Sequence, residues 1–404
     1  MSLSKPKHRE VVPTAKQNLE SSVGEQQRRQ IIRSSGFPSE SHTITTPDGY
    51  IAEIHRIPHG RRGPSSRKED LAPVLFQHGI LCSSASHLLI GPNDSLPFLL
   101  ADAGYDVWLG NSRGNTYSRA HVTLEPNEYK FWNYTWHEAA LHGVSAEIDF
   151  VLETTNKKKL VYIGHSMGTT MFFVLMSTRP EYNRKIEVGM LMAPVAYLKH
   201  TKSPLFRLFA PLGNALFNLA MRLGVGEVLA GSKLIKLIED YFCEHSDVDR
   251  AVCGNIIHII TGDDPNAYEK EYLDLLLHHF PEGYSVKAFN HYVQLINCGK
   301  FRMYDYGKKG NMKEYGLPAP PDYDLKKITA PMFFYVGKND YLADVTDINK
   351  LTKEVKSLKS MYLVENNKFG HLDFLIGCKV KELLYNKMIQ DLTRHLKNST
   401  GLIA

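Results

Sequence analysis

The chain has 404 residues, of which 43% are hydrophobic and 23% are charged, and its formal net charge is +5 at pH 7. This length and composition supply enough apolar side chains for a large core, which excludes a disordered or fibrous protein. The small net charge, without a long basic block, argues against a nucleic-acid partner.

The sequence lacks the patterns of a membrane-spanning helix, a signal peptide and a zinc site. No run of about 18 apolar residues occurs, so we predict no membrane-spanning helix. Residues 1–40 are polar and charged, and we expect a peripheral arm there without a signal peptide. The five cysteines lack the spacing of a zinc site, so we expect neither a metal nor a cofactor.

The segment after the arm has the pattern of an α/β domain. Residues 44–57 read as two strands joined at Pro47-Asp48-Gly49, which predicts an antiparallel hairpin. Short apolar runs follow, separated by helical stretches. They occupy residues 73–76, 106–109, 160–163 and 189–192. This alternation is typical of a parallel sheet built from βαβ units.

The run at 160–163 leads directly into Gly164-His165-Ser166-Met167-Gly168, a GxSxG motif followed by an apolar helical stretch. This order of strand, sharp turn and helix is that of a nucleophile elbow. Glycines are needed because side chains beside Ser166 would collide in so tight a turn. The sequence therefore predicts Ser166 as a nucleophile.

A second GxSxG motif, Gly110-Asn111-Ser112-Arg113-Gly114, provides an internal comparison. It also follows an apolar stretch, but a polar run to Pro126 comes after it. Since an elbow requires a helix after the turn, we predict that Ser112 lies in a structural loop.

The alternation of strands and helices stops after Pro194. Residues 196–321 are predicted to be mostly helical and to form an inserted cap or lid. Strands resume at 331–336 and 360–364, and an amphipathic helix is predicted over 379–397. We therefore expect a core in two parts, 41–195 and 322–404, interrupted once by the cap.

A serine hydroxyl needs a base to take its proton, and the base needs an acid to orient it. Asp340 follows the strand at 331–336, and His371 follows the strand at 360–364. Both therefore belong to the edge of the sheet where Ser166 also lies. Asp344 and Asp347 precede a helical run and suit helix capping instead. We predict Asp340 as the acid and His371 as the base.

Acyl transfer also needs hydrogen-bond donors for the developing oxyanion. One predicted donor is the amide of Met167, the residue after the nucleophile. The other is the amide of Ile80, in the loop that follows the strand at 73–76, where Gly79 permits the chain to turn. The alternative interpretation of His78-Gly79 is a simple turn that ends a strand.

Taken together, several strings resemble the acid lipase family of gastric, lysosomal and insect lipases. They are Gln77-His78-Gly79, the stretch 103–115, Gly164-His165-Ser166-Met167-Gly168, Asn339-Asp340 with Leu342-Ala343-Asp344, and His371-Leu372-Asp373-Phe374. The resemblance covers residues 36–396. It implies a capped α/β-hydrolase fold with a mostly parallel sheet, a triad of Ser166, Asp340 and His371, and oxyanion amides at Ile80 and Met167.

Two strings depart from that family. Met167 stands where the family usually has Gln, and Leu141-His142-Gly143-Val144 replaces the usual Tyr-Asp-Leu-Pro. Because the oxyanion donor is a main-chain amide, we expect Met167 to alter the wall of the pocket without abolishing activity.

The resemblance has further implications. It implies a disulfide between Cys243 and Cys253, so that the remaining cysteines are unpaired and expected to be buried; these are Cys82, Cys298 and Cys378. It also implies a secreted or lysosomal protein. Glycosylation triplets consistent with export begin at Asn93, Asn133 and Asn398.

We therefore predict a serine ester hydrolase that cleaves triacylglycerol or sterol esters at an oil-water or membrane interface through an acyl-enzyme. Two alternatives stay open, namely a carboxylesterase for short soluble esters and a lipase-like lipid-binding protein that has lost catalysis. The intact triad argues against the second. In the cap, the apolar segment 204–221 is either a lid face that meets lipid or a helix packed on the core.

Overall fold

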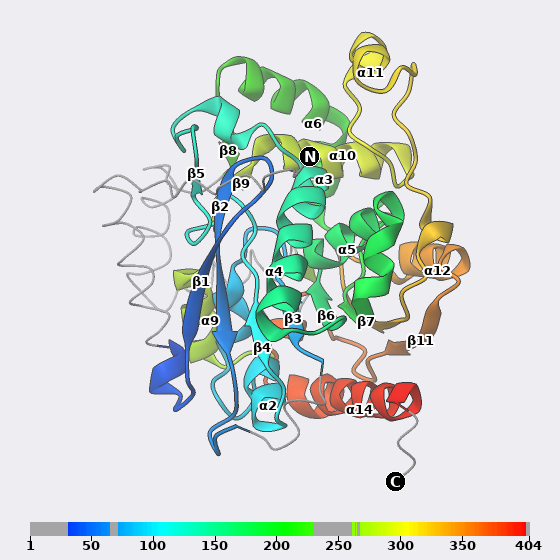
Figure 1. The fold of residues 1–404 in the computed structure, drawn as a ribbon. Coiled ribbons are helices and arrows are strands. Elements are labelled where there is room, and N and C mark those ends of the chain that lie inside the picture. Colours follow the sequence, from blue (N-terminus) through cyan, green and yellow to red (C-terminus); the bar gives the residue numbers. More distant parts are fainter. Residues whose placement is uncertain (1–30, 65–71, 229–260, 263, 265–266, 401–404) are drawn as a thin grey trace.

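A computed structural model describes residues 31–64, 72–228, 261–262, 264 and 267–400 of the chain (Figure 1). Within these residues the main sheet has nine strands, in the order β1-β2-β4-β3-β6-β7-β10-β11, with β5 paired to β2. Their bounds are β1 (Glu40–Thr45), β2 (Tyr50–Ile57), β3 (Val74–Gln77), β4 (Val107–Leu109), β5 (Ala120–His121), β6 (Leu160–His165), β7 (Ile186–Met192), β10 (Met332–Val336) and β11 (Leu358–Leu363). A two-stranded ribbon pairs β8 (Glu227–Val228) with β9 (Tyr284–Ser285).

The α-helices of the described residues are α2 (Leu96–Asp102), α3 (Trp136–Glu138), α4 (Ser145–Thr155), α5 (Met167–Thr178), α6 (Pro204–Arg222), α9 (Lys270–His278), α10 (Val286–Cys298), α11 (Gly307–Tyr315), α12 (Val345–Glu354), α13 (Asp373–Ile376) and α14 (Asn386–Thr400). Wide π turns precede α4 and α14, at Ala139–Val144 and Lys381–Tyr385. Short 3₁₀ helices are Ser84–His87, Tyr129–Trp132, Pro180–Lys185 and Leu325–Lys327.

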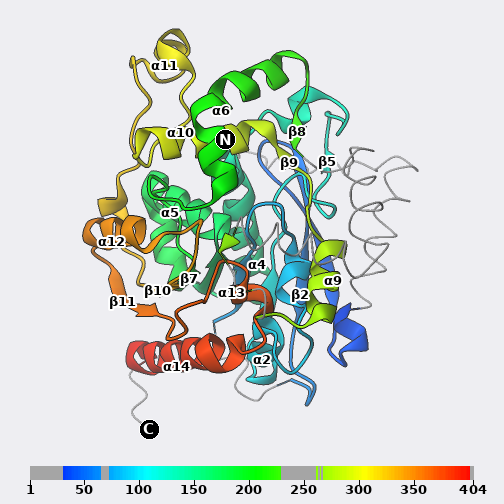
Figure 2. The same ribbon diagram turned by 180° about the vertical axis from the view of Figure 1, so that it is seen from behind.

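The predicted hairpin is confirmed, because β1 and β2 pair antiparallel around the turn at Gly49. The pairing from β4 to β11 is parallel throughout. Every residue of β3, β4 and β6 is buried, which explains their unbroken apolar runs. Helices α4 and α5 cover one face of the sheet, and α9 and α13 lie on the other, as Figures 1 and 2 show. The α/β architecture predicted from the sequence is confirmed.

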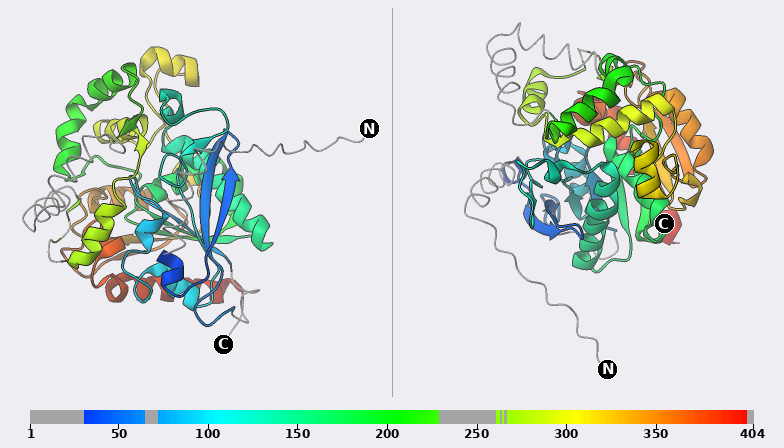
Figure 3. Two further views of the ribbon diagram at one scale, coloured as in Figure 1. Left: turned by 90° about the vertical axis from the view of Figure 1, so that its left-hand side faces the viewer. Right: turned by 90° about the horizontal axis from the view of Figure 1, so that it is seen from above.

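Between β7 and β10 the described chain is mainly helical. Helices α6 and α10 cross above the sheet in the view from above (Figure 3). Their axes approach closely, since a Cβ added at Gly213 would lie 2.6 Å from Val293. The rings of Phe206 and Phe289 stack across the same contact at 6.5 Å between centroids. These two helices therefore form a packed layer over the end of the sheet that carries Ser166.

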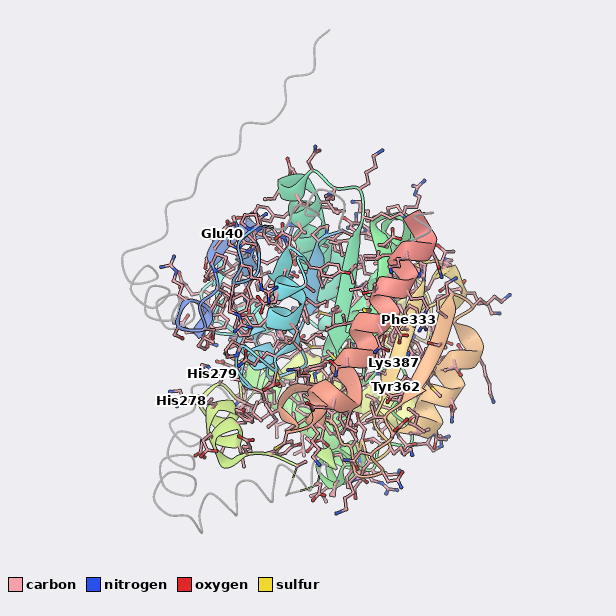
Figure 4. The ribbon with its side chains drawn as sticks, turned by 90° about the horizontal axis from the view of Figure 1, so that it is seen from below. Glu40, His278, His279, Phe333, Tyr362 and Lys387 are labelled. Atoms are coloured by element: carbon pink, nitrogen blue, oxygen red, sulfur yellow. The ribbon has the colours of Figure 1, made fainter. Side chains whose placement is uncertain are left out.

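The C-terminal helix, α14, lies at the opposite end of the molecule from α6 and α10 (Figure 1). The helix predicted over 379–397 is found as a π turn at Lys381–Tyr385 that continues directly into α14. The turn carries Leu384 and Tyr385 into the core. Figure 4 shows α14 beside β10 and β11, where the Lys387 ammonium lies 5.7 Å from the ring centre of Tyr362. No helix of the described residues is long and apolar enough to cross a membrane.

The prediction that the unpaired cysteines are buried is correct only for Cys82. Cys298 ends α10 at the surface, and Cys378 lies in the exposed connection after α13. Their positions at element ends, rather than the apolar character of the thiol, decide their exposure. Cys243 and Cys253 lie outside the described residues.

Candidate active site

Ser166 occupies the turn between β6 and α5 with φ 53° and ψ −115°, a region that residues with a side chain rarely adopt. The neighbouring glycines permit this turn. A Cβ at Gly164 would lie 3.0 Å from the carbonyl carbon of Gly168, and one at Gly168 would lie 2.4 Å from the carbonyl oxygen of Gln77. Any side chain at position 168 would therefore push the elbow away from β3.

The structure brings Ser166, His371 and Asp340 together. The Nε2 atom of His371 lies 2.9 Å from Ser166 Oγ, and its Nδ1 atom lies 2.8 Å from Asp340 Oδ2. A carboxylate can only accept, so Nδ1 carries the proton and Nε2 is the nitrogen that can accept the serine proton. All three side chains are at least nine-tenths buried. The imidazole is thus held between a hydroxyl and a carboxylate, the arrangement that activates a serine.

The carboxylate of Asp340 is itself fixed by the chain that follows β10. Its Oδ1 atom accepts hydrogen bonds from the amides of Leu342 and Ala343, at 2.9 and 2.8 Å. This leaves Oδ2 for His371. Two backbone donors and one imidazole therefore determine the orientation of the acid.

The loop that carries His371 is held by two residues, His165 and Asp373, to which the sequence analysis assigned no role. His165 Nε2 lies 3.1 Å from the carbonyl oxygen of His371, and the Asp373 carboxylate accepts a hydrogen bond of 2.6 Å from the Gly370 amide. Burial lowers the pKa of His165 well below its usual range, so its ring stays neutral beside the base. Their only sequence signal is position, since each lies within two residues of a predicted site residue.

The segments that carry the two predicted oxyanion donors both adjoin Ser166. Met167 is the first residue of α5, where backbone amides have no partner within the helix. On the other side, a Cβ added at Gly79 would lie 3.3 Å from Ser166 Cβ. The loop that carries Ile80 therefore passes in direct contact with the nucleophile.

The second GxSxG motif lies in a buried loop after β4 and is not followed by a helix, as predicted. The hydroxyl of Ser112 lies 3.8 Å from the sulfur of Met171, and its amide donates to His78 Nε2 at 3.0 Å. Neither contact would activate a nucleophile, because a thioether sulfur is not a base that can take the hydroxyl proton.

The two competing aspartates have the capping roles that were predicted. Asp344 is the N-cap of α12 and accepts a hydrogen bond of 2.7 Å from the Thr346 amide. Asp347 lies in the first turn and pairs with His200 at 2.8 Å. Among the residues that the structure describes, no group of three or more His, Cys, Asp or Glu side chains is arranged to hold a metal ion.

Comparison with known proteins gives consistent results. Residues 28–91 match the family model of a partial alpha/beta-hydrolase lipase region, and residues 72–246 match that of the alpha/beta hydrolase fold. Lipase 3 of Drosophila melanogaster is 40% identical over 366 residues, which cover 89% of this chain and 91% of the relative. Gastric triacylglycerol lipase of Bos taurus is 37% identical over 369 residues, 89% of each chain.

The fold is also shared with solved structures of much lower identity. A putative lipase from Sulfolobus solfataricus superimposes with a TM-score of 0.57 at 14% identity, covering 89% of this chain and 95% of the other. A monoglyceride lipase from Saccharomyces cerevisiae gives a TM-score of 0.51 at 16% identity, with the same coverage. At these identities the likeness concerns the fold alone.

Proposed function

Because this chain belongs to the acid lipase family of gastric, lysosomal and insect lipases and is a carboxylic ester hydrolase of the lipase type, we propose that Ser166, Asp340 and His371 are its catalytic triad. One observation carries this proposal. The buried imidazole of His371 lies 2.9 Å from the hydroxyl of Ser166, a residue with positive φ, and 2.8 Å from the carboxylate of Asp340.

In the proposed reaction, Ser166 Oγ attacks the ester carbonyl while His371 takes its proton, and Asp340 stabilises the imidazolium that forms. The amides of Ile80 and Met167 hold the negative charge on the carbonyl oxygen. His371 then returns the proton to the leaving alcohol, which leaves the acyl group on Ser166. A water molecule, activated by the same imidazole, releases the carboxylic acid.

We propose triacylglycerol or sterol ester as the substrate, and a secreted or lysosomal location. The substrate proposal is supported by a relative named gastric triacylglycerol lipase. The location is supported by that name and by the exposure of Asn93, Asn133 and Asn398, the first residues of the three glycosylation triplets. Fractionation of the native protein tests the proposed location. The alternative of a catalytically silent lipid-binding protein is opposed by the intact hydrogen bonds of the triad.

A substrate panel separates a lipase from an esterase for short soluble esters. We expect the purified enzyme to hydrolyse emulsified triacylglycerol or cholesteryl ester, with a rate that rises when the substrate passes its solubility limit. A soluble p-nitrophenyl ester serves as the reference, and each substrate is assayed between about pH 4 and pH 9. Turnover of the soluble ester alone, without any rise for an emulsion, would support the carboxylesterase instead.

We propose that residues 196–321 form a cap between two parts of the core, 41–195 and 322–404, and that α6 is its lipid-facing side. Phe206 and Phe217 of α6 are half-buried, whereas leucines on the helix and just after it are exposed. These are Leu208, Leu216, Leu219 and Leu223, with 70%, 45%, 54% and 73% exposed. The side chains of Leu205, Phe209 and Leu212 lie outside the described residues. An amphipathic helix with such an apolar outer face suits contact with lipid.

Removing part of that face should affect lipid substrates selectively. Replacing Leu216 and Leu219 together by serine is expected to lower hydrolysis of an emulsified long-chain ester about thirtyfold, because each exposed leucine that enters lipid contributes about 1 kcal/mol. Hydrolysis of p-nitrophenyl butyrate should not change. Replacing Asn214 and Asn218, which are exposed on the same helix, by serine is the matched control. A parallel fall of both activities would show that α6 acts only in packing.

A further inference from the structure

His78 and the second GxSxG motif have no part in the chemistry above, yet both are bonded to the loop beside Ser166. We propose that His78 is a positioning residue that orients the Gly79–Ile80 peptide and so aims the Ile80 amide at the carbonyl oxygen of the substrate. This inference rests on the proposed function, which makes Ile80 an oxyanion donor.

The hydrogen bonds of His78 define which of its ring nitrogens donates. The Nε2 atom lies 3.0 Å from the Ser112 amide, and Nδ1 lies 2.7 Å from the Gly79 carbonyl oxygen. A backbone amide can only donate, so Nε2 is the acceptor, and Nδ1 carries the proton and donates to Gly79. Burial lowers the pKa of His78 to about 4, which keeps the ring in this neutral form.

Holding the Gly79 carbonyl also determines the direction of the next amide. The carbonyl of Gly79 and the N–H of Ile80 belong to one planar peptide unit, and in the trans form they point in opposite directions. This peptide is not among the cis bonds of the described chain. A Cβ added at Gly79 would lie 3.3 Å from Ser166 Cβ, so this peptide lies beside the nucleophile. In the proposed geometry, a rotation of the peptide plane would turn the Ile80 amide away from the reacting carbonyl.

The second GxSxG motif supplies the fixed support for His78. Asn115 Nδ2 lies 3.3 Å from His78 Nε2 and donates to Asn111 Oδ1 at 3.0 Å. The same Asn111 oxygen accepts a hydrogen bond of 3.0 Å from the Ser84 amide. These side chains are buried, so the loop 110–115 is held by bonds that water does not replace. The motif thus contributes a backbone amide and no nucleophile.

The far end of the oxyanion loop is also attached. The carbonyl oxygen of Leu81 accepts a hydrogen bond of 2.8 Å from the Glu282 amide. The Glu282 carboxylate in turn accepts from the amide and hydroxyl of Thr116, at 2.9 and 2.6 Å. The Gly79–Ile80 peptide therefore lies between His78 and Leu81, and both of these residues are linked by hydrogen bonds to the loop 110–116. Of the two, His78 is the residue whose side chain contacts the peptide.

Two amide substitutions separate the two hydrogen bonds of His78. In His78→Asn the side-chain nitrogen can replace Nδ1 and donate to Gly79, but the acceptor for Ser112 is lost. In His78→Gln the side-chain oxygen can replace Nε2 and accept from Ser112, but the donor to Gly79 is lost. Both variants are assayed for kcat/KM with p-nitrophenyl butyrate and with its thionoester, in which sulfur replaces the carbonyl oxygen.

The ratio of the two rates reports the oxyanion donors, because sulfur is a weak acceptor and gains less from an amide than oxygen does. It does not depend on how much of a variant folds. We expect His78→Gln to lower the ester-to-thionoester ratio about tenfold or more, part of the 10²–10³-fold that one oxyanion donor contributes. His78→Asn should keep a ratio close to that of the wild type.

His121 provides the matched control, because it makes the same kind of contacts elsewhere. Its Nε2 atom bonds the Asp48 carbonyl at 2.9 Å, and its Nδ1 atom accepts from the Thr123 amide at 3.0 Å. His121→Gln should leave the ratio unchanged. Equal changes in both His78 variants, no change in either, or a loss in His78→Asn alone would overturn the inference while the proposed function stands. A wild-type enzyme without ester hydrolysis would overturn the proposed function, and this inference with it.

Discussion

Replacing Ser166 with alanine is expected to abolish ester hydrolysis, with a loss of about 10⁶-fold in kcat, as when a serine hydrolase loses its nucleophile. The variant should fold normally, because the hydroxyl's partner is His371 and the elbow is maintained by its glycines. Steady-state hydrolysis of p-nitrophenyl butyrate measures the loss, and a thermal melt checks the fold.

Ser112→Ala is the control, since both serines lie in GxSxG motifs. We expect no more than about a tenfold loss, because the substitution keeps the Ser112 amide that bonds His78 and removes only a weak contact with Met171. A folded Ser112→Ala variant without turnover would move the nucleophile to the other motif.

Asp340→Asn is expected to lower kcat about 10⁴-fold, which is the effect of the same change in a serine protease triad. An asparagine can accept the amides of Leu342 and Ala343 through its oxygen, as Asp340 does. Its NH₂ group would then face His371 Nδ1 and favour the wrong tautomer. Activity against p-nitrophenyl butyrate measures this loss. A thermal melt of the variant shows whether it is still folded.

Asp344→Asn separates this role from helix capping. Asparagine caps a helix nearly as well as aspartate, but the ion pair of Asp344 with Lys202 at 2.8 Å would be lost. We expect activity close to that of the wild type and a fall in unfolding free energy of about 1 kcal/mol or less. Similar losses of kcat in the two variants would contradict the assignment of Asp340.

The strands and the nucleophile elbow were predictable from the sequence because each has a local cause. Strands buried on both faces are expected to be mainly apolar, and the fully buried strands β3, β4 and β6 contain the apolar runs 74–76, 107–109 and 160–163. The elbow needs glycines where Cβ atoms would collide, and Gly164 and Gly168 lie at those places. Asp340 and His371 were found for a related reason, since parallel strands bring the residues that follow them to one edge.

The supporting contacts of the site could not be predicted, because they join loops that are distant in the chain. His165 bonds the backbone of His371 across 206 positions, and His78 bonds Ser112 across 34. Hydrophobic periodicity does not indicate which distant loops form hydrogen bonds with each other. A helical apolar pattern likewise does not tell whether a face meets solvent, as the exposed leucines of α6 illustrate.

The central claim is that Ser166 carries the acyl group, and covalent labelling tests it most directly. The enzyme is treated with a p-nitrophenyl alkylphosphonate, which transfers its phosphonyl group to an activated serine and mimics the tetrahedral intermediate. Peptide mapping by mass spectrometry then locates the label. We predict one label per chain, on Ser166, with loss of activity in proportion to labelling. A label on Ser112 or another residue, or inactivation that leaves Ser166 unmodified, would contradict the proposed mechanism.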